Sequence, residues 1–154
     1  MRVLTAPYYF NAYNSSQKTL FLAGGITNCP EWQNDVLDEF KKLPVTILNP
    51  RRENFPIEDP NASVEQIKWE HRHLELADGI MFWFPKESIC PIVLFELGKY
   101  LRNKTNLFIG THLKYPRRQD VVIQTKLVRE DLTIHTSIND LCTDVIDNFV
   151  NKKK

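Results

Sequence analysis

The chain has 154 residues, enough for one domain that buries about two-thirds of the surface of its unfolded state. Hydrophobic residues make up 42% of the chain and charged residues 25%, a composition typical of a compact globular protein. Its 20 basic and 19 acidic residues give a net charge of +1, which argues against a nucleic-acid partner held by bulk electrostatics. We therefore expect a single domain, residues 1–154, in which residues 1–18 form an N-terminal arm.

The cysteines and histidines indicate neither a disulfide framework nor a metal site. Cys29, Cys90 and Cys142 are odd in number and far apart, and no CxxC motif occurs. His71 and His73 lie two residues apart on a predicted helix, where they point about 200° apart and cannot bind one ion together. We expect no metal and no cofactor.

The hydropathy pattern predicts neither a membrane span nor a signal peptide. No segment reaches about 18 consecutive apolar residues, and no long apolar run follows a basic N-terminus. Free thiols are typical of a reducing compartment, so the cytoplasm is the expected location.

The N-terminal arm is irregular and aromatic. Val3 and Leu4 could form a short strand, which Pro7 would end. Its aromatic side chains could pack onto the chain's own domain or cover a neighbouring subunit, and they are Tyr8, Tyr9, Phe10 and Tyr13.

Beyond the arm, short apolar runs alternate with segments of helical periodicity. In chain order the predicted elements are a strand at Thr19–Ala23, a helix at Glu31–Leu43, a strand at Val45–Leu48, a helix beginning at Ser63, a strand at Asp78–Phe84, a helix from Pro91 to about Arg102, a strand at Thr105–Gly110, a helix over 119–129, a strand at Thr133–His135 and a helix at Ser137–Val150. Ser63 followed by Gln66 is a capping-box pattern. Because strands and helices alternate without a hairpin signal, we predict an α/β protein whose five-stranded, mainly parallel sheet is covered by helices on both faces.

Ligands of an open parallel sheet bind outside the carboxyl ends of its strands. Gly24 and Gly25 follow the first predicted strand, where they either let the backbone approach a ligand or form a plain turn. Asn49, Arg51 and Arg52 follow the second strand. The two arginines either bind a phosphate or form salt bridges with a neighbouring glutamate, Glu53 or Glu58.

Two carboxylates are predicted among apolar neighbours. Glu70 shares a helix face with Ile67 and Leu74, and Glu96 follows the apolar residues 92–95. A charge in such surroundings is costly unless it is used or paired. Either carboxylate could pair with an arginine, such as Arg51, Arg52 or Arg72. Two of them on helices flanking one strand favour a site in which one acts as a nucleophile at an anomeric carbon and the other as acid/base. Gly98, which follows Glu96, is expected to permit close helix packing.

With these residues in hand, the chain resembles the nucleoside 2-deoxyribosyltransferase-like family. The matching segments occur in the family's order from about Thr19 to Lys104, and they are FLAGGI with a following Trp32, LNPRR, EQIKWE, ADGIMFWF and PIVLFELG. The resemblance implies a flavodoxin-like three-layer fold and cleavage of the N-glycosidic bond of a 2′-deoxyribonucleoside through a covalent deoxyribosyl-enzyme.

The resemblance also implies roles for single residues. Glu96 would attack C1′, Glu70 would be the acid/base group, and Gly24 and Gly25 would line the sugar and base pocket. A neighbouring subunit would complete the site with a residue after the fourth strand, an asparagine in characterised relatives and about Asp120 in this chain. Where well-studied members carry a tyrosine that orients the nucleophile, this chain has Phe21.

Three functions remain open at this stage. The first is a deoxyribosyltransferase, and the second is an N-glycosidase that uses water on a nucleoside 5′-monophosphate bound through Arg51 and Arg52. The third is a nucleotide-binding module without turnover. We expect a homo-oligomer, since the resemblance implies shared active sites and Trp83, Phe84 and the aromatic arm offer apolar surface.

Overall fold

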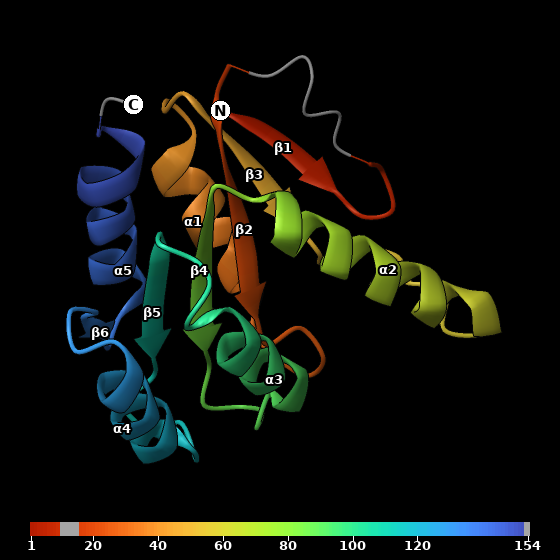
Figure 1. Cartoon of the computed structure of the whole chain (residues 1–154). Helices are drawn as coiled ribbons and strands as arrows, with labels where there is room; N and C mark the ends of the chain where they lie inside the picture. Colours follow the sequence, from red (N-terminus) through yellow and green to blue (C-terminus); the bar gives the residue numbers. More distant parts are fainter. Residues whose placement is uncertain (10–15, 153–154) are drawn as a thin grey trace.

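The computed structural model describes residues 1–9 and 16–152, and it is built around one parallel sheet (Figure 1). Phe10 and Tyr13 of the predicted aromatic arm lie outside the described residues. The strands are β1 (Arg2–Thr5), β2 (Lys18–Gly24), β3 (Val45–Asn49), β4 (Gly79–Phe84), β5 (Leu107–Thr111) and β6 (Ile134–His135). All neighbouring strands pair in parallel, in the order β1-β3-β2-β4-β5-β6.

Strands β2 to β6 follow the flavodoxin-like order, in which the first strand of the five lies between the second and the third. The prediction of an α/β fold with a parallel sheet is therefore confirmed. The sheet has six strands in place of the predicted five, because β1 adds to the edge of β3 with Val3 opposite Ile47. The short apolar pair Val3–Leu4 forms a strand because β3 offers a free edge to pair with.

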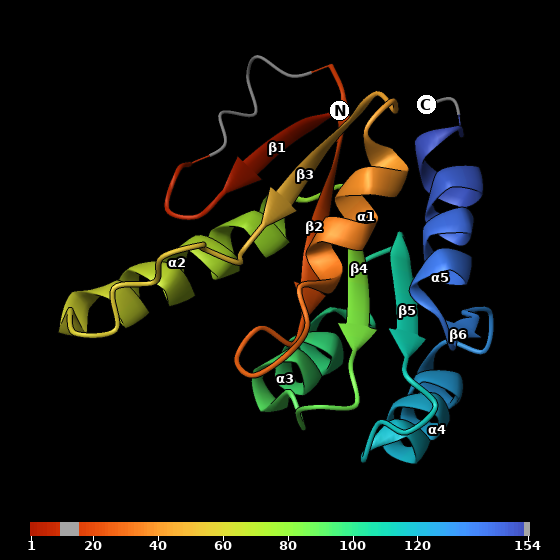
Figure 2. The same cartoon turned by 180° about the vertical axis from the view of Figure 1, so that it is seen from behind.

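Helices cover both faces of the sheet, as predicted. Figure 1 shows α2, α3 and α4 on one face, and Figure 2 shows α1 and α5 on the other. The helices are α1 (Trp32–Phe40), α2 (Pro60–Leu76), α3 (Pro91–Tyr100), α4 (Arg118–Val128) and α5 (Ile138–Val145), and α5 continues into a π-helical turn at Ile146–Val150. Within the described residues no helix has the length and apolar character needed to cross a bilayer.

Each face of the sheet has its own hydrophobic core because successive strand side chains point to opposite faces. Phe21 and Phe82 pack under α2 and α3 with Trp69. Leu22 and Trp83 pack under α1 and α5. Phe84 is fully buried and Trp83 is 5% exposed, so the expectation that these two side chains offer an apolar surface to a partner is wrong.

Helix α2 begins earlier than predicted. Asp59 is its N-cap and accepts a hydrogen bond from the amide of Asn61 at 2.9 Å, with Pro60 in the first turn. Proline is favoured at that position because its missing N–H would be unpaired in any case. Ser63 is therefore an exposed residue inside the helix, and the prediction that it caps the helix is wrong.

The described part of the arm packs on its own domain. The backbone carbonyl of Tyr8 accepts a hydrogen bond from the indole N–H of Trp69 on α2 at 2.7 Å, and the Tyr9 ring lies 5.6 Å from the His73 ring. The Tyr9 ring thus contacts its own domain, whereas the Tyr8 side chain is 73% exposed, so covering a neighbouring subunit stays a prediction for Tyr8.

Candidate active site

A cavity of about 390 Å³ opens at the carboxyl ends of β2 and β4, between α2 and α3. This is where ligands bind in open α/β sheets, and the volume is in the range of small-molecule sites. The cavity is lined by Phe21, Ala23, Gly24, Gly25, Ile26, Thr27, Pro50, Glu70, Ser88, Cys90, Pro91, Ile92, Val93 and Glu96. Five of the sequence-predicted site residues thus meet in one place, namely Phe21, Gly24, Gly25, Glu70 and Glu96.

Glu70 enters the cavity from α2. Burial raises the pKa of its carboxyl, while a hydrogen bond from Gln66 opposes that rise. The donor is Gln66 Nε2, which lies 2.8 Å from Glu70 Oε1. The buried stripe of α2 runs through Trp69 and His73, whereas Ile67 is 64% exposed, so the prediction that Ile67 shares the buried face is wrong.

Glu96 enters the cavity from α3 and is the more strongly perturbed of the two carboxyls. Its pKa is raised to about 8, first because burial disfavours the charged form and second because Glu70 is near, with a smaller opposing effect of Lys99. Among the described residues neither Glu70 nor Glu96 forms an ion pair, so pairing with an arginine is not what accounts for them. At neutral pH the pair therefore holds a proton, chiefly on Glu96.

The start of α3 fixes where Glu96 lies. Cys90 precedes the helix with a left-handed backbone (φ 52°), and Pro91 occupies the first turn. The Ser88 hydroxyl accepts a hydrogen bond from the Cys90 amide at 3.2 Å, and the Tyr115 hydroxyl donates to the Ile89 carbonyl at 2.6 Å. These contacts hold the loop after β4, so that Glu96 follows about a turn and a half into the helix.

Gly24 ends β2, Gly25 follows it, and both form part of the cavity wall. Neither has a positive φ, so the turn does not require glycine for its backbone angles. A Cβ on Gly24 would lie 2.6 Å from the Trp83 carbonyl oxygen, and one on Gly25 would lie 2.7 Å from Cys29 Sγ. The glycines are therefore required by packing behind the cavity, and the Gly25 carbonyl also accepts a hydrogen bond from the Trp32 indole at 2.9 Å.

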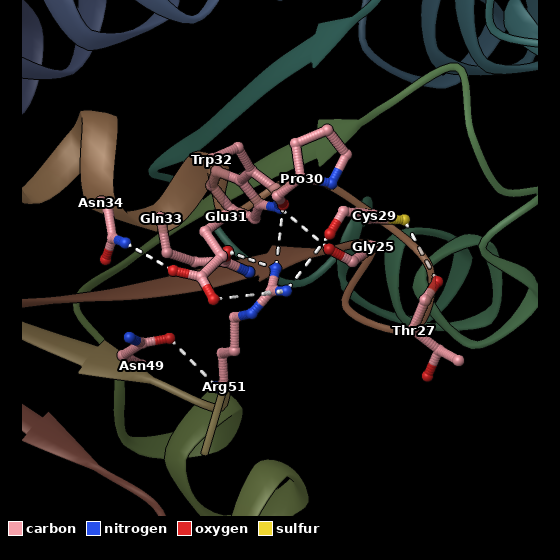
Figure 3. Close-up of polar contacts among 10 residues, drawn as sticks. All are labelled: Gly25, Thr27, Cys29, Pro30, Glu31, Trp32, Gln33, Asn34, Asn49 and Arg51. Atoms are coloured by element: carbon pink, nitrogen blue, oxygen red, sulfur yellow. Dashed lines mark hydrogen bonds and ion pairs between the residues drawn. The ribbon is translucent and has the colours of Figure 1, made fainter. Parts of the chain in front are cut away.

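Arg51 holds the loop between β2 and α1 (Figure 3). Its guanidinium donates to the carbonyls of Pro30 at 2.9 Å and Cys29 at 3.2 Å, and to Gln33 Oε1 at 3.2 Å. Glu31 lies farther away, at 4.0 Å. The alternative of a salt bridge with Glu53 or Glu58 is not seen among the described residues, and the guanidinium of Arg51 is instead occupied by the loop carbonyls.

Arg52 pairs with Glu65 on α2 at 3.3 Å and lies over the Phe55 ring. With Asn49 and Arg51 it lines a second cavity, of about 640 Å³, beside β1 and α1. Ile26 lines both cavities, so they adjoin. Asn49, which ends β3, and the two arginines after it thus lie next to the Glu96 cavity and do not line it.

Asp120 also lies apart from the Glu96 cavity. It is exposed in the first turn of α4, forms an ion pair with Arg117 at 3.1 Å, and lines a separate hollow against Gly98. A Cβ on Gly98 would meet no atom within 4 Å, so the expectation that this glycine permits close packing inside the chain is wrong.

No cluster of side chains suited to hold a metal ion occurs within the described residues.

The sequence reasoning missed several residues that shape the site. Gln66 could have been found, since it lies one helical turn before Glu70, where side chains meet. Ile26, Cys90 and Tyr115 carry no local signal, because their part in the site depends on which loops the sheet brings together.

The fold and this cavity define a flavodoxin-like α/β protein with two half-buried carboxyls, Glu70 and Glu96, at the carboxyl edge of its sheet, and neither has an ion-pair partner among the described residues. Residues 17–115, more than half of the chain, match the family described as nucleoside 2-deoxyribosyltransferase like. The chain belongs to that family. A search of curated proteins found no match.

Proposed function

We propose that the protein is a nucleoside 2-deoxyribosyltransferase that cleaves the N-glycosidic bond of 2′-deoxyribonucleosides through a deoxyribosyl ester of Glu96. The observation that carries this proposal is the pair Glu70 and Glu96, which line one cavity without an ion-pair partner among the described residues. Membership of the family supports a nucleoside as the substrate class.

One proton shared between the two carboxyls is enough for the whole cycle. When substrate binds, the proton moves from Glu96 to Glu70, and Glu70 then donates it to the leaving base. The Glu96 carboxylate attacks C1′ as the C1′–N bond breaks, and the product is a glycosyl ester with an ionised Glu70. Glu70 next takes a proton from the acceptor base, the acceptor nitrogen attacks C1′, and Glu96 leaves as a carboxylate.

Water can replace the acceptor base in the second step, which would make the protein an N-glycosidase. A requirement for a 5′-monophosphate finds less support, because Arg51 is bonded to loop carbonyls and Arg52 to Glu65. Both arginines line the adjoining cavity, so a phosphate there would have to displace these partners.

We also propose that the protein is a homo-oligomer. Ile92 and Phe95 on α3 are 63% and 72% exposed, next to the cavity. Gly98 on the same helix has open space around it, although glycine inside a helix costs about 1 kcal/mol relative to alanine. A second copy packed against α3 would account for these features. The resemblance implies that such a copy completes the site with its own residue at about position 120.

The test is intact-protein mass spectrometry after mixing with 2′-deoxynucleosides and their 5′-monophosphates, together with chromatography for free base. The proposal expects a deoxyribosyl adduct that is absent in Glu96→Gln, with exchange of the base when a second base is added. Free base without exchange would instead identify a hydrolase. Neither adduct nor free base from any substrate would favour a binding module and refute an enzyme.

A further inference from the structure

We propose that Gln66 is a positioning residue for Glu70, which holds one oxygen of that carboxyl against the end of β3 and leaves the other for the substrate. This inference rests on the proposed function, in which Glu70 is the acid/base group. It concerns a side chain that does not line the cavity itself.

The contacts of the Gln66 amide carry the argument. Its Nε2 donates two hydrogen bonds of 2.8 Å, one to Glu70 Oε1 and one to the backbone carbonyl of Pro50. A backbone carbonyl can only accept, so this contact fixes which end of the amide faces Glu70. Gln66 thus ties the carboxyl on α2 to the residue that follows β3.

The other end of the amide shows what this orientation costs. Gln66 Oε1 is buried, and no donor reaches it within the described residues. An unpaired buried acceptor is unfavourable, and such groups in native proteins call for an explanation. The amide keeps this arrangement because its nitrogen serves two acceptors at once.

The Gln66 contact has consequences for proton transfer. It occupies Glu70 Oε1, while no hydrogen bond within the described residues reaches Glu70 Oε2, so Oε2 is the oxygen available to donate to or accept from a ligand in the cavity. A donor to a carboxylate favours its ionised form. Gln66 therefore also favours the arrangement in which Glu96 holds the proton before substrate binds.

The test uses Gln66→Met, which keeps an unbranched side chain of similar length without the donor, and Gln66→Glu, which replaces the donor with an acceptor. Lys68→Ala, at an exposed position on the same helix, is the matched control. The first measurement follows the Glu70 carboxyl by ¹³C NMR across a pH titration, with Glu70→Gln for assignment. We expect Glu70 to titrate at a higher pH in Gln66→Met than in the wild type, and higher again in Gln66→Glu.

The second measurement is the pH profile of kcat/KM for base release. We expect kcat/KM of Gln66→Met to fall on the order of 10- to 100-fold, because Glu70 would no longer be held in place. We also expect the acidic limb of its pH profile to move to higher pH. A uniform loss at every pH, or an unchanged titration of Glu70, would overturn the inference while leaving the proposed function intact. A wild type that releases no base would refute the proposed function. The NMR titration would still decide whether Gln66 positions Glu70 and sets its charge.

Discussion

Replacing Glu96 by glutamine should stabilise the protein at alkaline pH and leave its stability nearly unchanged at acidic pH. The pKa of Glu96 is raised from 4.5 to about 8, mainly by burial and next by Glu70. Between these two pH values the folded protein holds a proton that the unfolded chain has released. The free energy of unfolding therefore falls as pH rises through this window, and the cost is complete above pH 8.

The size of the effect follows from the shift. At about 1.4 kcal/mol per pH unit, the full window corresponds to on the order of 5 kcal/mol. Glutamine has the same shape as glutamate and no charge, so Glu96→Gln removes this cost without opening a cavity. At pH 9 the free energy of unfolding of Glu96→Gln should exceed that of the wild type by up to this amount. Its Tm should be higher by on the order of 10 °C.

The assay is urea unfolding of wild type and Glu96→Gln at pH 5, 7 and 9. Other groups titrate in both proteins and cancel in the difference. Glu58→Gln, at an exposed position, is the matched control. Glu70→Gln should move the window to lower pH, because it removes the second cause of the shift. A Glu96→Gln difference that is equal at pH 5 and pH 9 would refute the reasoning.

Four further outcomes are expected. Gly24→Ala should lower the free energy of unfolding by about 1–3 kcal/mol, because its Cβ would lie 2.6 Å from the Trp83 carbonyl oxygen. Gly98→Ala has open space around its Cβ and should raise the free energy of unfolding by up to about 1 kcal/mol. Both values are measured by urea unfolding, for Gly98→Ala on the monomer. Arg51→Ala should lower the free energy of unfolding by about 1–3 kcal/mol, because it leaves loop carbonyls without their hydrogen-bond donor. In kinetic assays it should slow base release from nucleosides and from their 5′-monophosphates equally. A loss of activity confined to the monophosphates would reveal a phosphate site. Phe95→Glu should shift the sedimentation coefficient to that of a monomer at micromolar concentration, and an unchanged value would remove α3 from the interface.

Much of the fold could be predicted because its signals are local. Apolar runs such as Thr19–Ala23 are long enough to identify buried strands, and their alternation with helices is typical of a parallel sheet. The strand at Arg2–Thr5 was only a possibility, since its pairing depends on the free edge of β3. Ile67 was misassigned because the buried stripe of a helix depends on what lies opposite, and periodicity alone does not supply that.

In the candidate site, too, some features could be predicted from the sequence and others depend on which segments meet in the fold. The meeting of Glu70 and Glu96 follows from the rule that strand ends converge at one edge, and the structure brings them to one cavity. The role of Arg51 could not be predicted, because its partners are backbone carbonyls of residues 29 and 30, which carry no sequence signal. Asp120 remains a prediction that depends on a second copy of the chain.

The two glycines at the end of β2 also limit how this protein can evolve or be redesigned. A side chain at Gly24 would press into Trp32 and Trp83, and one at Gly25 into Cys29, so this part of the cavity wall cannot be reshaped without disturbing the residues packed against it. Ile92, in contrast, lines the cavity and is largely exposed on α3. Changes in base preference should therefore come from substitutions at positions such as Ile92, and a directed-evolution library restricted to such positions would sample new specificities while leaving the two glycines intact.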